Sequence, residues 1–105
     1  MSELQNKAVT LAMQSEGDLL SQSPADRSVP FLESALHLYF ALGGDSERAM
    51  ALASARRPAA ARKPDAAIAD VMIEVAVASH LADLDMVQAT YNRLDVELAA
   101  PRRKK

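Results

Sequence analysis

The chain has 105 residues, of which 50% are hydrophobic and only 4% aromatic, with no cysteine and a formal net charge of −2. This length fits one small domain, and the composition is that of a globular rather than a disordered protein. The lack of cysteine excludes a disulfide framework, a thiol nucleophile and a zinc-ribbon site.

Residues that start and stop helices divide the chain into five predicted helices. Abundant alanine and leucine, with only 3 glycines, favour helix over sheet. The first helix begins at the capping pattern of residues 2–5, and the second ends at Gly43 and Gly44. Pro24 and Pro30 break the stretch between them. In chain order, we expect helices over about residues 2–20, 31–42, 47–57, 64–82 and 86–99.

The second and fourth predicted helices differ from the others in polarity. Apolar residues occur around nearly the whole circumference of 31–42 and 64–82, whereas the other three helices are amphipathic. A helix that is apolar on all sides is normally buried. We therefore predict an all-α fold, a compact bundle of about five helices in which these two are central and buried. One helical domain would span residues 1–100, with a basic disordered tail at 101–105.

The sequence contains no stretch that predicts a membrane span. Its longest uncharged run is the 11 residues 34–44, whereas a spanning helix needs roughly 18 apolar residues. The first residues lack the basic start of a signal peptide, so we expect a cytoplasmic protein. Alanine-rich helices bury little area per residue, and this favours a homo-oligomer, in the simplest case a dimer.

Basic residues are concentrated in two runs, 56–63 and 102–105. Such runs meet phosphates or acidic partners, or they form a solvated loop and a frayed chain end. Aromatic residues are not interleaved with them, so a nucleic acid is not an expected partner.

Each of the two apolar helices keeps one narrow polar line. Glu33 and His37 lie four residues apart on the first, and Asp70 and Glu74 lie four apart on the second. If the lines face each other, three carboxylates and an imidazole converge, as in the divalent-metal sites of helical bundles. Carboxylate oxygens suit Mg²⁺ or Mn²⁺, which would hold a phosphate chain and activate water. Alternatively, both lines face solvent.

Three segments follow the pattern of one enzyme family. They are the helix opening at 3–5, the run 32–38 (Leu-Glu-Ser-Ala-Leu-His-Leu), and the run 68–73 (Ile-Ala-Asp-Val-Met-Ile) with 81–85 and Ala89 downstream. In these segments the chain resembles the MazG-like all-α nucleoside triphosphate pyrophosphohydrolases. It departs from their acidic motifs, because Ser34 and His37 stand where two glutamates belong and Ala67 stands where a third belongs, while Asp70 is in place.

The resemblance implies metal-dependent cleavage of a nucleoside triphosphate to a monophosphate and pyrophosphate. If the polar lines replace the missing acids, Mg²⁺ or Mn²⁺ would be held by Glu33, Asp70 and Glu74, with His37 as a catalytic base or a further ligand. The residues that would contact the phosphates are basic: Arg93, Arg62 and Lys63. The departures leave three interpretations open: a site rebuilt around these residues, a relative that has lost catalysis, or a likeness only between one helical hairpin and another.

Two non-catalytic interpretations stand beside the enzyme. Segments 31–57 and 65–99 each have the pattern of a helical hairpin, and Pro30 and Pro64 lie 34 residues apart, the period of tetratricopeptide repeats. A helical adaptor, chaperone or inhibitor would present such hairpins to a protein partner. An accessory protein would instead keep the pyrophosphohydrolase scaffold and use it for assembly.

Overall fold

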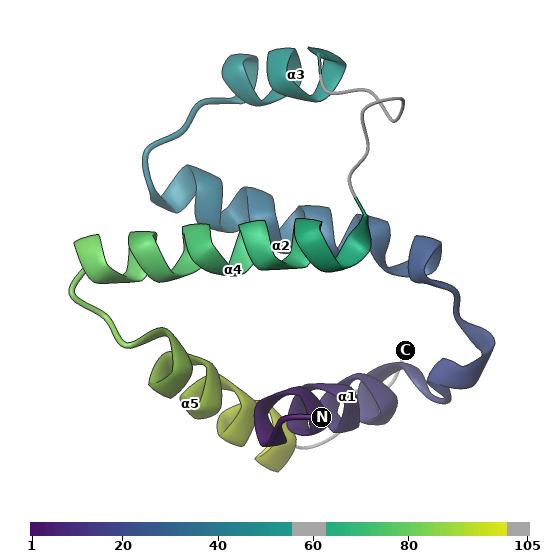
Figure 1. Cartoon of the computed structure of the whole chain (residues 1–105). Helices are drawn as coiled ribbons and strands as arrows, with labels where there is room; N and C mark the ends of the chain where they lie inside the picture. Colours follow the sequence, from purple (N-terminus) through teal and green to yellow (C-terminus); the bar gives the residue numbers. More distant parts are fainter. Residues whose placement is uncertain (56–62, 101–105) are drawn as a thin grey trace. The chain divides into compact units, whose positions relative to one another are not determined.

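The computed structural model describes residues 1–55 and 63–100, and this part of the chain is helical (Figure 1). The predicted tail at 101–105 therefore lies outside the described residues. No strand occurs within the described ranges, so the expectation of an all-α chain is confirmed. The elements are α1 (Glu3–Glu16), the short 3₁₀ helices η1 (Leu19–Ser21) and η2 (Pro24–Arg27), α2 (Ser28–Ala41), α3 (Ser46–Ala55), α4 (Pro64–Leu81) and α5 (Met86–Ala99).

The first helix is shorter than predicted because Gly17 ends it. Gly17 has a φ of 90°, and its N–H donates to the carbonyl oxygen of Met13. Glycine adopts positive φ at little steric cost, so it commonly terminates helices. The Asp18 side chain then accepts a hydrogen bond from the N–H of Leu20, at 2.9 Å, and η1 begins there. The prediction of a helix through residue 20 is wrong by one turn.

The helix α2 begins at Ser28, three residues before the predicted start. Pro30 therefore lies in its first turn rather than before it. The first four N–H groups of a helix have no partner within the helix, so proline removes no hydrogen bond at this position.

The chain divides into two units. The first comprises Met1–Asp26 and the described residues from Ser79 onward, and the second comprises Arg27–Ala78. In the first unit α1 packs against α5 and against η1. Leu94 of α5, only 5% exposed, is the one buried hydrophobic residue in the described part of the chain. Among the described residues, the buried position thus lies on α5, the helix that packs against α1.

The second unit differs from the expectation of two buried helices. None of the described residues of α2, α3 or α4 is buried. Packed helices have axes 8–10 Å apart, and the described parts of these three helices do not approach one another so closely. A helix that is apolar on all sides needs neighbours on several sides, which this unit does not provide.

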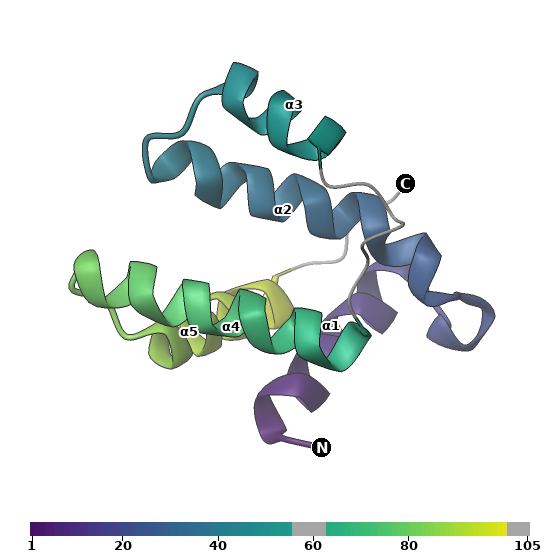
Figure 2. The ribbon, with the colours of Figure 1, turned by 45° about the horizontal axis from the view of Figure 1, so that its top comes forward.

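Two helix–turn–helix corners, one in each unit, are built alike and lie forty residues apart. In the α2–α3 hairpin, where the helices run antiparallel (Figures 1 and 2), the N–H of Gly44 donates to the carbonyl of Tyr39 at 3.0 Å. At the α4–α5 corner, the N–H of Leu84 donates to the carbonyl of Ser79 at 2.9 Å. These bonds close the same type of helix end, one that requires a positive φ at the residue before the donor.

The residues at positive φ and the caps that follow them also correspond. Gly43 has a φ of 101° and Asp83 a φ of 61°. Asp45 caps α3 by accepting from the N–H of Arg48 at 2.8 Å. Asp85 caps α5 in the same manner, with N–H donors at 3.0 and 2.9 Å from the two residues Val87 and Gln88. An aspartate in this position stabilises a helix by satisfying its unpaired N–H groups.

The two corners differ in which residue of an interacting pair is large. The Tyr39 ring covers Gly44, and its hydroxyl donates to the carbonyl of Asp45 at 2.9 Å. A Cβ atom at Gly44 would overlap that ring. At the other corner the tyrosine is replaced by Ser79, and the glycine by Leu84. A small residue at one position thus accompanies a large residue at the other.

We predict that Gly44→Ala lowers the free energy of unfolding by about 1–3 kcal/mol, the usual cost of overpacking. The reason is the overlap between the new methyl group and the Tyr39 ring. Urea denaturation followed by circular dichroism measures the change. The matched control is Leu84→Ala at the equivalent, exposed position, which should change stability by no more than about 0.5 kcal/mol. Equal losses in the two variants would contradict the prediction.

Candidate functional site

The residues predicted to hold a metal ion lie on two helices of the second unit. Glu33 and His37 are on α2, Asp70 and Glu74 are on α4, and all four are exposed. Across residues 1–55 and 63–100, no group of three or more histidine, aspartate or glutamate side chains is placed to hold a metal ion. The structure therefore does not gather these four residues into one cluster.

The residues predicted to contact phosphates are distributed along the chain. Arg93 lies on α5 in the first unit and forms an ion pair with Glu97, one helical turn away, at 3.5 Å. Such exposed pairs contribute little to stability. Lys63 is exposed directly before α4 in the second unit, whereas Arg62 lies outside the described residues. No shared phosphate site follows from these positions.

Exposed apolar side chains are the most prominent feature of the second unit. Thirteen large hydrophobic residues there are between 40% and 69% exposed. Single exposed hydrophobic residues are ordinary, but here no buried residue accompanies them in the described part of the unit. They are Val29, Phe31, Leu32, Leu38, Phe40, Leu42, Met50, Leu52, Ile68, Val71, Met72, Ile73 and Val77.

The sequence pattern also gives the direction of these apolar faces. At 100° per residue, Met72 projects from the side of α4 opposite the line of Asp70 and Glu74. On α2, Ala35 and Tyr39 lie on the side away from the polar line. Each helix therefore has an acidic edge and a broad apolar face. We call the apolar faces of α2 and α4, taken together, the apolar surface. Sequence reasoning identified these residues but assigned them to a core.

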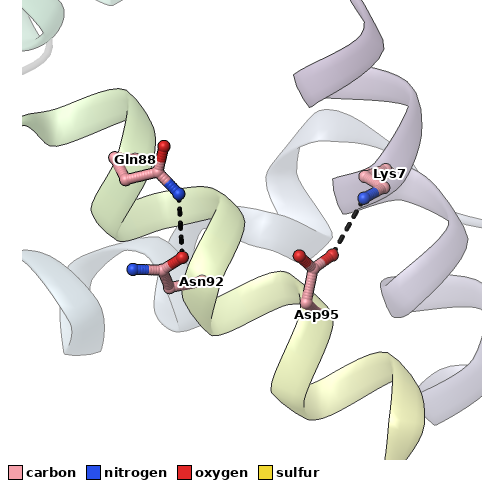
Figure 3. A network of polar contacts seen from close by, with 4 residues as sticks. All are labelled: Lys7, Gln88, Asn92 and Asp95. Atoms are coloured by element: carbon pink, nitrogen blue, oxygen red, sulfur yellow. Dashed lines mark hydrogen bonds and ion pairs between the residues drawn. The ribbon is translucent and has the colours of Figure 1, made fainter.

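The contact between α1 and α5 in the first unit is polar at its edge (Figure 3). Lys7 Nζ lies 2.9 Å from Asp95 Oδ1 and 5.3 Å from the centre of the Tyr91 ring. Within α5, the Gln88 side chain donates a hydrogen bond to the Asn92 side chain at 2.9 Å. The hydrogen bond to Asp95, helped by the carboxylate charge and opposed by desolvation, raises the pKa of Lys7 above its ordinary value.

The corner between α4 and α5 carries a shallow depression. Its lining consists of His80, Asp83, Leu84 and Asp85, all of which are exposed. Asp85 is engaged in capping α5. The depression is open to solvent, and it has too few apolar side chains to enclose a ligand.

Comparisons with protein-family models, with curated proteins and with solved structures gave no match for this chain. Among the described helices, none is long and apolar enough to cross a bilayer.

The raised pKa of Lys7 predicts a loss of stability at alkaline pH. Because the folded protein binds this proton more tightly than the unfolded chain, the contribution is complete below the unfolded value of about 10.4. It disappears as the pH rises through the higher folded value. Urea denaturation from neutral to alkaline pH should therefore show the stability advantage of the wild type over Lys7→Met shrinking.

The matched control is Lys7→Arg, because arginine stays charged throughout this range. Its advantage over Lys7→Met should persist at the alkaline end. A wild-type advantage that is independent of pH would contradict the assignment of the Lys7–Asp95 pair as a stabilising contact.

Proposed function

We propose that the chain is a non-catalytic helical interaction module, on whose apolar surface another polypeptide chain docks. The observation that supports this most directly is the exposure of the large hydrophobic residues of α2 and α4, in a unit whose described residues include none that is buried. Partner proteins commonly cover such surfaces.

The free energy gained by covering these side chains favours docking over permanent exposure. Complete burial of one large apolar side chain contributes about 1.5–3 kcal/mol, so a side chain that is half exposed has roughly 1 kcal/mol still to gain. The seven such side chains on the apolar surface (Phe31, Leu32, Leu38, Ile68, Val71, Met72 and Ile73) could together add roughly 7 kcal/mol when covered. That gain is comparable to the cost of association, which is about 4–15 kcal/mol.

The two similar corners support an interaction module, because repeated helix–turn–helix elements are typical of proteins that bind other proteins. The corners repeat at forty residues, whereas Pro30 and Pro64 repeat at 34. The two intervals differ by six residues: α4 is four residues longer than α2, and Pro64 is the first residue of α4 whereas Pro30 is the third residue of α2. The spacing of the corners therefore departs from the regular tetratricopeptide period.

Photo-crosslinking tests the proposal. A photoreactive phenylalanine analogue at position 31, on the apolar face of α2, should crosslink the full chain to another polypeptide in cells, with mass spectrometry of the product identifying that polypeptide. The control places the analogue at position 13 on α1, because Phe31 is 54% exposed and Met13 is 46% exposed. We expect the product at position 31 to be several times more abundant. Equal or absent crosslinking at the two positions would overturn the proposal.

A second candidate function is metal-dependent nucleoside triphosphate pyrophosphohydrolysis. It is favoured by Glu33, His37, Asp70 and Glu74, which lie in one unit with side chains accessible to a solvated nucleotide. Mg²⁺ is often held by one or two carboxylates together with phosphate oxygens of the substrate. A cluster of three protein ligands is therefore not required. In this candidate, His37 is the base and Lys63, in the same unit, contacts phosphates.

Pyrophosphate release from ribo- and deoxynucleoside triphosphates, with Mg²⁺ or Mn²⁺, tests the second candidate. We expect Asp70→Ala to lower the rate at least about 100-fold, since even outer-shell partners of metal ligands cost 10–100-fold. Glu47→Ala, an acidic residue on α3 outside the candidate site, should keep the wild-type rate. Wild-type release no faster than that of Asp70→Ala would eliminate the enzyme.

A further inference from the structure

We propose that the polypeptide docking on the apolar surface is a second copy of this chain, so that α2 and α4 of two copies form a four-helix core. This inference rests on the proposed function and names its partner. It follows from the apolar character of the two helices, from the area that they expose and from the position of their acidic edges.

The number of apolar helices in each chain favours pairing with a second copy. A helix with apolar residues on most sides needs more than one neighbour, and each chain carries two such helices. Four helices around a common core are a standard solution to this requirement. A second copy supplies helices of matching length and polarity, with α2 about 21 Å long and α4 about 27 Å long.

The exposed apolar area has the scale of a weak interface between two copies. Seven of the exposed large hydrophobic residues lie on α2 and α4 away from the acidic edges: Phe31, Leu32, Leu38, Ile68, Val71, Met72 and Ile73. Half of a large apolar side chain corresponds to about 50 Å², so these seven offer about 350 Å² per chain. Two copies together would bury about 700 Å² in these side chains alone, the scale of a weak, reversible interface.

The charge of the acidic edges on α2 and α4 determines which faces can meet. Two-fold symmetry brings identical surface patches together, so acidic edges placed in the contact would face acidic edges. Such like-charge contacts are unfavourable. The edges formed by Glu33 on α2 and by Asp70 and Glu74 on α4 therefore belong outside the contact. This orientation places Met72, which lies opposite the acidic edge of α4, at the centre of the interface.

The test is the molar mass of the full chain in solution, measured by light scattering after size exclusion. We expect twice 11.3 kDa for the wild type. Met72→Lys should weaken dimerisation at least about tenfold, because a charge would lie in the buried contact. The control is Met13→Lys on α1, since Met72 is 45% exposed and Met13 is 46% exposed. This variant should remain a dimer.

Two further measurements separate loss of the interface from loss of folding. Circular dichroism of Met72→Lys should show retained helices, and Leu32→Lys on α2 should repeat its effect on mass. If either variant unfolds, the wild-type melting temperature decides, because that of a dimer rises with protein concentration. A monomeric wild type with a constant melting temperature would overturn the proposal, as would dissociation of Met13→Lys to the same extent as Met72→Lys.

The outcome is distinguishable from failure of the proposed function. A monomeric chain that crosslinks at position 31 to a different protein would refute the second copy and keep the interaction module. A monomeric chain without such a crosslink would refute both.

Discussion

The structure depends on a mismatch between helices that are apolar on nearly every side and neighbours, among the described residues, that do not cover them. The helix α4 has 18 residues, with acidic side chains confined to its start and to one edge. Its own chain leaves Ile68, Met72 and Ile73 substantially exposed. Close packing occurs instead where the helices are amphipathic, between α1 and α5. The more hydrophobic half of the molecule is thus the less buried half.

Helix boundaries were largely predictable because local interactions determine them. The caps at Ser2, Asp45 and Asp85 all accept hydrogen bonds from N–H groups two or three residues ahead, and their residue types signal this directly. The end of α1 at Gly17 was not predicted, because a glycine within an amphipathic pattern does not by itself indicate a helix end. The start of α2 was predicted three residues too late, because a proline is compatible with the first turn of a helix.

Burial and the candidate site were less predictable because both depend on contacts between distant residues. The four-residue spacing correctly placed Glu33 with His37 and Asp70 with Glu74 on common helix edges. It did not determine whether the two edges converge, and in the described structure they form no metal cluster. The same residues that suggested a core describe a surface instead. Composition reports the tendency to be covered, but not which chain provides the cover.

At each of the two corners a large residue is paired with a small one, and this pairing restricts which substitutions a corner tolerates. Tyr39 with Gly44 and Ser79 with Leu84 are both compatible pairs, whereas a tyrosine opposite a leucine would bring two large side chains into one space. One pair can therefore be converted into the other only through an intermediate that is small at both positions. The order of substitutions matters, and grafting one corner onto the other requires both residues to be moved together.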